Sequence, residues 1–421
     1  MKEYAKTFEE FDYYPLEGQP YFDNDRYWVS PLNFLPESLA KMPEKIQIHD
    51  CTLRDGEQTP RVTYTRPERV RIAQQLNELG VDRIEIGMPV ISEDLRNAIK
   101  DVLKMDFKSK IVSFSRAHPD DIRMSIECGV RDIIVEHTVN PYLCKYAYHL
   151  DEDGLLKRVS ESIAAAKKGG LWTNYMGWDF SRTPLEFSRK VYQAAVDAGA
   201  DALTIVDTFA VATPAAIGYA VRKMHEWFPG VQLEFHVHND FGLGMATAMA
   251  AVENGVTVIH TAMNALGERT GNLATEEVAT TFGILMGNRT NVQLDKLNYT
   301  SKLISDITGI YPNVNKTVFG ANCFGIESGV VSHYTEAMRR VGFKPIAYPY
   351  LPEVVGRTES DYFIGYLSGR LTVEYYLQKN GMEATKEQEE EILSAMKAEC
   401  LIRKALLTEQ EFITIAKKIL A

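Results

Sequence analysis

Two histidines one residue apart, His236 and His238, are the residues whose spacing first suggests chemistry. They follow residues 231–235, an apolar run that is typical of a β-strand. Residues i and i+2 of a strand point to the same side, so both imidazoles would face one point. Neutral imidazoles in this arrangement can bind a divalent metal ion, although histidine pairs also occur as hydrogen-bonded core residues. The pair alone leaves both interpretations open.

The segment that contains this pair, residues 45–289, repeats one pattern. Short β-rich runs alternate with amphipathic segments, which often end at a glycine. The runs predict strands near 46–50, 83–87, 110–114, 131–135, 171–175, 202–206, 231–237 and 257–261. Eight such units over about 240 residues predict an α/β fold, a (β/α)8 TIM barrel. An open doubly wound sheet is the alternative, but no Gly-x-Gly-x-x-Gly follows the first run.

The flanking segments and the composition suggest the setting of this barrel. Residues 1–44, rich in aromatics and prolines, predict an N-terminal arm, and residues 290–421 predict a mostly helical lid or dimerisation region of a homodimer. The net charge of -11 argues against nucleic-acid binding. Five scattered cysteines, no CxxC, no signal core and no apolar run long enough to cross a membrane lead us to expect a cytoplasmic enzyme that acts on small molecules.

Polar and charged residues follow nearly every predicted strand, where a TIM barrel carries its active groups. Each has a simple structural alternative: Asp207 could cap a helix and Arg54 could form a surface ion pair. Their joint occurrence favours an active site. Two imidazoles with one or two oxygen ligands suit Mn²⁺, Zn²⁺, Co²⁺ or Mg²⁺ with open positions. Such an ion could bind a 2-oxo acid and polarise its carbonyl, and an arginine beside it could stabilise an enolate oxygen.

Three motifs resemble those of one family of metalloenzymes. They are Asp50-x-Thr-Leu-Arg-Asp-Gly-Glu-Gln58, His236-x-His-Asn-Asp-x-Gly242 and the loop 264–272, Asn-Ala-Leu-Gly-Glu-Arg-Thr-Gly-Asn. The chain from about Lys45 to Gly287 thereby resembles the barrel enzymes that include isopropylmalate, homocitrate and citramalate synthases and hydroxymethylglutaryl-CoA lyase. The resemblance implies the metal ligands Asp55, His236, His238 and Asn272. It further implies that Arg54 stabilises an enolate oxygen, and it implies substrate contacts at Glu85, Trp178, Asp179, Thr208 and Thr261.

The loop distinguishes the branches of this family. The lyases carry a cysteine in it, whereas residues 266–269, Leu-Gly-Glu-Arg, resemble the synthases. The implied reaction condenses acetyl-CoA or another acyl-CoA with a 2-oxo acid, and thioester hydrolysis then gives a 2-hydroxy dicarboxylic acid. A carbon–carbon lyase or aldolase with the same metal is the first alternative, and a non-catalytic protein that binds a metabolite is the second.

The chain departs from the synthases around the substrate. Ile326 and Val331 stand where the synthases have histidines, one of them implied in proton transfer. His333, Glu268 and a tyrosine of residues 290–421 are therefore our candidates for the general base. Trp178 replaces a glutamate that contacts the oxo acid in the synthases, which would reshape the pocket. The resemblance leaves open which oxo acid and which acyl group react.

Overall fold

A computed structural model describes residues 16–358 and 362–421 of the protein. The contacts between residues divide the chain into two compact units, residues 32–312 and residues 313–421 together with the segment up to Pro31. The boundaries that we placed at residues 44 and 289 stay predictions. All the predicted site residues except His333 lie in the unit 32–312.

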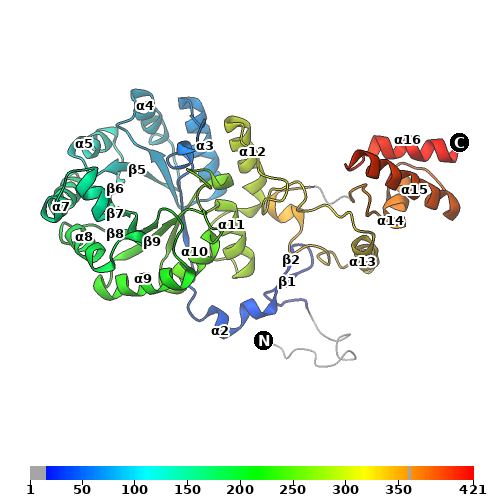
Figure 1. Ribbon diagram of the computed structural model, residues 1–421, viewed down its shortest axis with the longest axis horizontal. Coiled ribbons are helices and arrows are strands. Elements are labelled where there is room, and N and C mark those ends of the chain that lie inside the picture. Colours follow the sequence, from blue (N-terminus) through cyan, green and yellow to red (C-terminus); the bar gives the residue numbers. More distant parts are fainter. Residues whose placement is uncertain (1–15, 359–361) are drawn as a thin grey trace. The chain divides into compact units, whose positions relative to one another are not determined.

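Eight parallel strands in the unit 32–312 close into a barrel (Figure 1). They are β3 (Gln47–Asp50), β4 (Arg83–Gly87), β5 (Lys110–Arg116), β6 (Asp132–Thr138), β7 (Trp172–Trp178), β8 (Ala202–Asp207), β9 (Gln232–Val237) and β10 (Val258–Thr261). β10 closes the ring by pairing in parallel with both β3 and β9. The predicted TIM barrel is confirmed, and the open doubly wound sheet is excluded.

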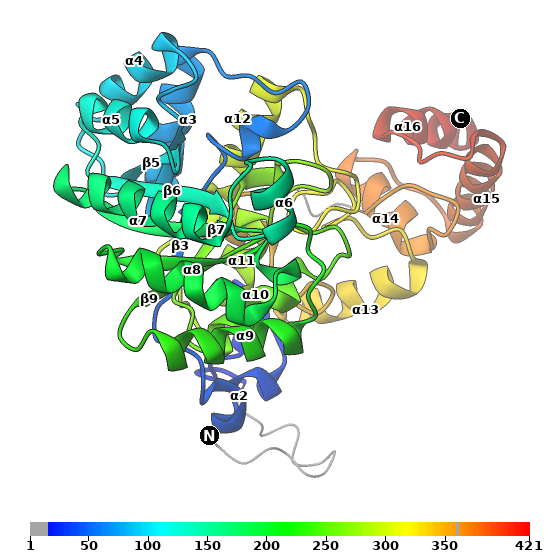
Figure 2. The same cartoon turned by 60° about the vertical axis from the view of Figure 1, so that its left-hand side comes forward.

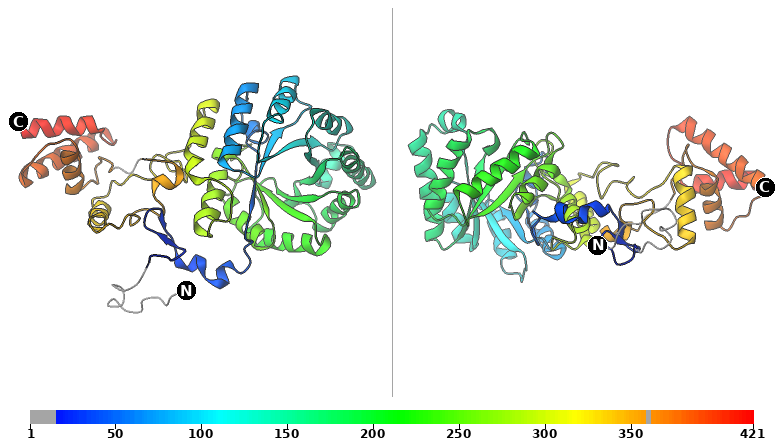
Figure 3. Two further views of the ribbon diagram at one scale, coloured as in Figure 1. Left: turned by 180° about the vertical axis from the view of Figure 1, so that it is seen from behind. Right: turned by 90° about the horizontal axis from the view of Figure 1, so that it is seen from below.

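Helices surround the strands, as the views from behind and below show (Figure 3). They are α3 (Arg66–Leu79), α4 (Glu93–Val102), α5 (Pro119–Cys128), α7 (Glu152–Lys168), α8 (Leu185–Asp197), α9 (Pro214–Trp227), α10 (Gly244–Glu253) and α11 (Thr275–Thr280). α7, α8 and α9 lie side by side on the outside (Figure 2). Local sequence sets the ends of these helices: α3 begins with a capping box of Thr65 and Glu68 and ends at Gly80, which has a φ of 90°. The short α6 (Pro141–Tyr146) precedes α7, and α12 (Leu297–Thr308) packs against α3.

The interior of the barrel is divided into a polar and an apolar half. The polar half comes from β9, β10, β3 and β4, whose buried inward side chains include Glu234, His260, His49 and Glu85. The apolar half comes from β5 to β8, where five buried side chains form one cluster: Val112, Phe114, Ile134, Met176 and Val206. Two buried polar side chains of β7 and β8, Asn174 and Thr204, also bond to each other, and Asn174 bonds to Glu234. Branched apolar layers commonly fill such barrels, so the polar half is the feature that needs a functional reason.

The second unit is mostly helical, as predicted. Its helices are α13 (Gly329–Arg340), α14 (Arg370–Lys379), α15 (Lys386–Arg403) and α16 (Glu409–Leu420). α15 packs against both α14 and α16 (Figure 1). The described part of the predicted arm is not wholly extended: β1 (Phe22–Asp23) and β2 (Tyr27–Trp28) pair, and the short α2 (Pro36–Leu39) follows. No helix among the described residues is long and apolar enough to span a bilayer.

Candidate active site at the carboxyl end of the barrel

The predicted ligands Asp55, His236 and His238 meet at the carboxyl ends of β3 and β9. Asp55 immediately precedes a 3₁₀ turn, Gly56–Gln58, His236 is the penultimate residue of β9, and His238 follows directly after the strand. The Oδ2 atom of Asp55 lies 3.3 Å from Nε2 of His236 and 3.7 Å from Nε2 of His238. All three side chains are buried. The two histidines thus face the same carboxylate, as the spacing predicted.

The protonation of these groups suits a cation. Burial would raise the pKa of Asp55, but the Arg54 guanidinium and the two histidines hold that pKa well below its usual range. Burial, together with His236, lowers the pKa of His238 to about 4. Nδ1 of His238 lies 3.2 Å from the carbonyl oxygen of Gly271, which can only accept a proton, so Nδ1 donates and Nε2 keeps its lone pair. An ionised carboxylate and neutral imidazoles are the donors that a divalent ion takes.

Asn272 adds a fourth donor beside His238. The two residues form a backbone bridge, and Nδ2 of Asn272 donates to the carbonyl of Leu266 at 2.8 Å. Its buried Oδ1 atom has no hydrogen-bond partner among the described residues, as expected of an oxygen whose partner would be a bound metal ion. Gly271 permits this loop, because its φ is 85° and a Cβ there would lie 1.7 Å from the carbonyl oxygen of Ala265. The residues present therefore fit a divalent metal ion.

Arg54 lies beside this cluster in a fixed orientation. Its Nε donates to Oε1 of Glu85 at 2.5 Å, and its Nη1 lies 3.4 Å from Oδ1 of Asp55. Its guanidinium carbon lies 4.2 Å from the centre of the Phe114 ring, a cation–π contact. Burial would lower the pKa of Arg54, but Glu85 and Asp55 raise it above its usual range, so the side chain stays charged. A held positive charge is what the stabilisation of a developing oxyanion requires.

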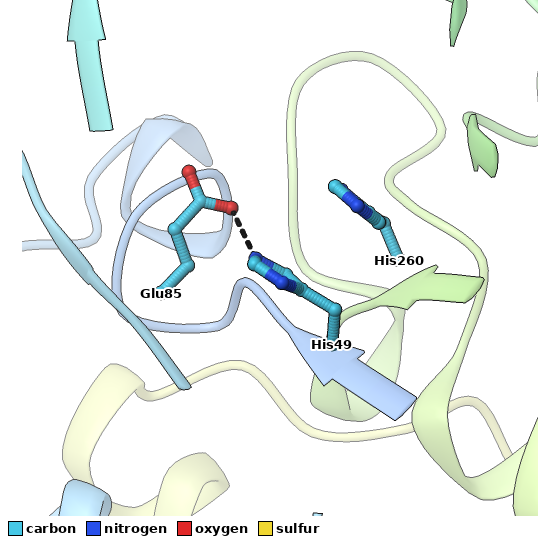
Figure 4. Close-up of side chains that lie close together, drawn as sticks. All are labelled: His49, Glu85 and His260. Carbon is cyan, nitrogen blue, oxygen red and sulfur yellow. Dashed lines mark hydrogen bonds and ion pairs between the residues drawn. The ribbon is translucent and has the colours of Figure 1, made fainter. Parts of the chain in front are cut away.

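Glu85 in turn rests on a stacked histidine pair (Figure 4). Oε2 of Glu85 lies 3.1 Å from Nε2 of His49. The His49 ring stacks on His260 with 4.2 Å between centroids and 11° between planes. His260 Nε2 lies 2.9 Å from Glu234, which accepts from Arg83 at 2.6 Å. A chain of buried polar groups thus connects Arg54 to Arg83 through the polar half of the barrel.

His49, Glu85 and His260 are also close enough together to suggest a second metal site. The lone pair of an imidazole nitrogen lies in the plane of its ring. Because the two rings are nearly parallel and stacked, their lone pairs do not converge on one ion. Each ring already faces a carboxylate oxygen. We therefore interpret this cluster as a hydrogen-bonded support of Arg54. Neither His49 nor His260 was singled out from the sequence, although they lie in the predicted strands 46–50 and 257–261.

A cavity of about 260 Å³ opens beside the predicted ligands. Its lining residues are Arg54, Asp55, Gln58, Met88, Phe114, Arg116, Glu136, Met176, Trp178, Val206, Thr208, His236, His238 and Glu268. Seven of them are predicted site residues: Arg54, Asp55, Trp178, Thr208, His236, His238 and Glu268. A second cavity of about 390 Å³ shares Arg54, Gln58 and Met88 with the first. Arg54 therefore faces two adjoining spaces, as a group that acts between two substrates would.

Comparisons with known proteins place this site in a family. The family model described as HMGL-like matches residues 45–304. The chain belongs to the HMGL-like family. It is 36% identical over 361 residues to 2-isopropylmalate synthase of Methanocaldococcus jannaschii, covering 85% of this chain and 68% of that protein. It is 34% identical over 368 residues to homocitrate synthase AksA of Methanopyrus kandleri, covering 87% and 91%.

The fold of the HMGL-like domain also has solved counterparts. Hydroxymethylglutaryl-CoA lyase from Pseudomonas aeruginosa superposes with a TM-score of 0.58 at 18% identity, over 64% of this chain and 95% of that one. This likeness shows the barrel fold. The family resemblance predicted from the three motifs is confirmed, and so is the prediction of an enzyme, because the curated relatives are named as synthases.

In this HMGL-like barrel the loop after β10 is tied to its neighbours by Arg269. Its Nε donates to Oδ1 of Asp240 at 2.9 Å, and its Nη2 donates to the backbone carbonyl of Thr208. The guanidinium also stacks over Phe209. These contacts hold the loops after β8, β9 and β10 together, and Glu268, the residue before Arg269, lines the cavity as a result.

Five predicted site residues line neither cavity of the HMGL-like barrel: Asn272, whose contacts are given above, and Glu85, Asp179, Thr261 and His333. Glu85 lies beneath Arg54, and the buried Asp179 accepts from Arg182 and, at 2.6 Å, from Asn140. The hydroxyl of Thr261 is bonded to that of Thr275 at 2.8 Å. His333 is exposed on α13, in the other unit. Their roles toward substrate stay predictions. Glu136, Arg116 and Gln58 line the cavity although the sequence analysis gave them no role.

Proposed function

We propose that this HMGL-like protein condenses an acyl-CoA, acetyl-CoA in the first instance, with a 2-oxo acid to give a 2-hydroxy dicarboxylic acid. The observation that carries the proposal is the convergence of Asp55, His236, His238 and Arg54 on one cavity. The names of the relatives, 2-isopropylmalate synthase and homocitrate synthase, support it.

Asp55, His236, His238 and Asn272 would hold the divalent ion, Mn²⁺, Zn²⁺, Mg²⁺ or Co²⁺. The ion, when bound, supplies Lewis-acid polarisation of the oxo-acid carbonyl. Arg54 donates to the oxygen of the thioester enolate, and Glu85 holds the guanidinium in place for this task. Trp178 and Thr208 line the cavity and would contact the oxo acid. Glu85, Asp179 and Thr261 do not line the cavity; each would hold a neighbouring side chain in position, namely Arg54, Arg182 and Thr275.

The proton of the acyl methyl group needs a base. Glu268 lines the cavity with a half-exposed side chain, so we propose that its carboxylate removes that proton, with His333 or a tyrosine of residues 290–421 as the alternatives. The resulting carbanion forms a C–C bond to the carbonyl carbon of the oxo acid, whose oxygen takes up a proton. Water then hydrolyses the thioester, which leaves a new carboxylate and the free thiol of CoA.

The proposal is tested by release of that thiol. Purified protein is incubated with acetyl-CoA, Mn²⁺ and a panel of 2-oxo acids, and free thiol is followed with a disulfide dye. We expect release that depends on one oxo acid and is abolished in Arg54→Met, while the surface variant Arg123→Met retains it. No release with any oxo acid would contradict the proposal. Release of pyruvate from a 4-hydroxy-2-oxo acid without CoA would instead support an aldolase.

We also propose that the protein acts as a cytoplasmic homodimer. The unit formed with residues 313–421 exposes large apolar side chains, among them Val330, Leu367 and Ile402, which a second copy could cover. All five cysteines are unpaired, as is usual in a reducing compartment. Light scattering on the eluting protein measures the mass, and a monomer at micromolar concentration would contradict the dimer.

A further inference from the structure

Glu136 is an acid near the carboxyl end of β6, on the apolar half of the barrel. It lies two residues after Ile134 in β6 and pairs in register with Arg116 of β5 and Met176 of β7. Met176 and Ile134 belong to the apolar cluster of β5 to β8. The Glu136 side chain lines the 260 Å³ cavity together with Phe114, Met176 and Val206. An acid in such a wall needs a reason, because an unpartnered carboxyl group is unfavourable beside apolar side chains.

Nothing in the described part of the chain satisfies this carboxyl group, which forms no hydrogen bond or ion pair there. The two cations of the cavity are engaged elsewhere. Arg116 donates to Asp121 through Nε at 2.7 Å and through Nη2 at 3.0 Å. Arg54 is bonded to Glu85. Burial raises the pKa of Glu136 to about 7. The charge of Arg54 lowers this pKa, whereas the charges of Asp55 and Glu85 raise it.

The strand order decides which part of a substrate reaches Glu136. In the closed barrel β10-β3-β4-β5-β6-β7-β8-β9, β6 lies opposite β10. The proposed metal ligands come from β9 and from the loops after β3 and β10, so they lie across the cavity from β6. This step rests on the proposed function: an oxo acid whose keto acid end lies at those ligands directs its side chain toward β5, β6 and β7.

We propose that Glu136 selects 2-oxo acids whose side chain ends in an uncharged group that both donates and accepts hydrogen bonds, such as a carboxamide. A carboxamide N–H donates to an ionised Glu136, and a carboxamide oxygen accepts from a protonated one, so the match holds in both states. An aliphatic end leaves the carboxyl group unsatisfied. A carboxylate end is repelled by ionised Glu136. Neither arginine of the cavity compensates for this, because Arg116 is bonded to Asp121 and Arg54 to Glu85.

The test uses three 2-oxo acids of nearly equal size: 2-oxosuccinamate, 2-oxo-4-methylpentanoate and freshly dissolved oxaloacetate, which end in a carboxamide, an isopropyl group and a carboxylate. Their Kd values for the Mg²⁺-loaded full chain are measured by calorimetry, and kcat and KM are measured by thiol release. We expect 2-oxosuccinamate to bind at least about tenfold more tightly than the other two. The Glu136→Leu variant should bind 2-oxo-4-methylpentanoate most tightly, and Glu136→Gln should gain affinity for oxaloacetate. Glu127→Gln, an exposed acid on α5, is the matched control and should keep the wild-type ranking.

Each outcome decides the proposal. An unchanged ranking in Glu136→Leu, tightest binding of either other acid by the wild type, or no binding of any of the three overturns it. An equal loss of kcat with all three acids at unchanged Kd in Glu136→Gln also overturns it, because Glu136 would then act in proton transfer. Absence of thiol release with the expected Kd ranking contradicts only the proposed condensation, whereas release without that ranking contradicts only the selection by Glu136.

Discussion

Replacement of Glu85 by glutamine tests the polar half of the barrel most directly. The substitution keeps the shape of the side chain but removes the negative charge that faces Arg54 at 2.5 Å and His49 at 3.1 Å. Burial would raise the pKa of Glu85, but Arg54 and His49 lower it from 4.5 to about 2. By linkage this difference contributes about 3 kcal/mol of stability at pH 7. Removing one partner of a buried ion pair typically loses about 3–5 kcal/mol, so the two estimates agree.

The sign of the pH dependence makes this prediction specific. The folded-state pKa of Glu85 is depressed, so its contribution is fully present above pH 4.5 and declines as pH falls through about 2. The contribution of about 3 kcal/mol at pH 7 should be slightly smaller at pH 4 and fall to about half at pH 3. Urea unfolding of metal-free wild type and Glu85→Gln at these three pH values measures the difference in the free energy of unfolding.

The control for this experiment is Glu127→Gln, which breaks an exposed pair with Arg123 and should lose less than about 0.5 kcal/mol. The reasoning fails if Glu85→Gln loses no more than this control, or if its loss is the same at pH 3 as at pH 7. A second consequence concerns Arg54, which loses its fixed orientation. We expect kcat of the condensation to fall by about 10²-fold in Glu85→Gln, with a smaller change in KM.

Three further predictions concern the metal site and the cavity. Asp55→Asn should weaken Mn²⁺ binding, measured by calorimetry, at least about 100-fold, because it removes the one charged ligand; wild-type affinity would contradict the proposed ligand set. Gly271→Ala should displace the loop, since its Cβ would lie 1.7 Å from a backbone oxygen, and should weaken Mn²⁺ binding although no ligand is changed; unchanged binding would contradict the role of this loop. Glu136→Gln should stabilise the metal-free protein at pH 8.5, because the raised pKa makes the ionised carboxylate unfavourable in the folded state above about pH 7. This gain should be about 1–2 kcal/mol, allowing for solvent in the cavity, and should vanish below pH 4.5; thermal unfolding at pH 8.5 and pH 4 measures it, and an equal gain at both would contradict it.

Strand geometry predicts part of the cluster of Asp55, His236 and His238, and the resemblance to the synthases singled out Asp55. Strand alternation places His236 and His238 on one side, and closure of a parallel barrel brings all the strand ends to one face. His49 and His260 were given no role, and Glu136 was only one of the polar residues that follow predicted strands, because which alternate residues point inward depends on the register of each strand. A slip of one residue exchanges the two faces. The register is visible only once the eight strands are paired.

Asp179 and Thr261 illustrate a different limit. The family resemblance predicts substrate contacts at both positions, but a resemblance does not say whether a side chain faces the cavity or supports a neighbour. The carboxylate of Asp179 is engaged by Arg182 and Asn140, and the hydroxyl of Thr261 is bonded to Thr275. Arg182 is only three residues from Asp179, but Asn140 lies 39 residues from Asp179 and Thr275 lies 14 residues from Thr261, separations that no local pattern covers. His333 lies in the other compact unit, and no local pattern places one unit against another.

The division of the barrel into two halves separates reactivity from selectivity. Charges that must stay fixed, those of Arg54, Glu85 and Glu234, lie in the polar half, where each is paired or hydrogen-bonded. Because these pairs are mutually dependent, a change in one of them disturbs the others. On the apolar half, Asn174 and Thr204 bond to each other and Asn174 also bonds to Glu234, but Glu136 forms no hydrogen bond with the described residues. Glu136 can therefore change without altering Arg54 or the metal ligands. We therefore expect substitutions on β5, β6 and β7 to alter which oxo acid binds while substitutions on β9, β10, β3 and β4 alter the rate with every oxo acid.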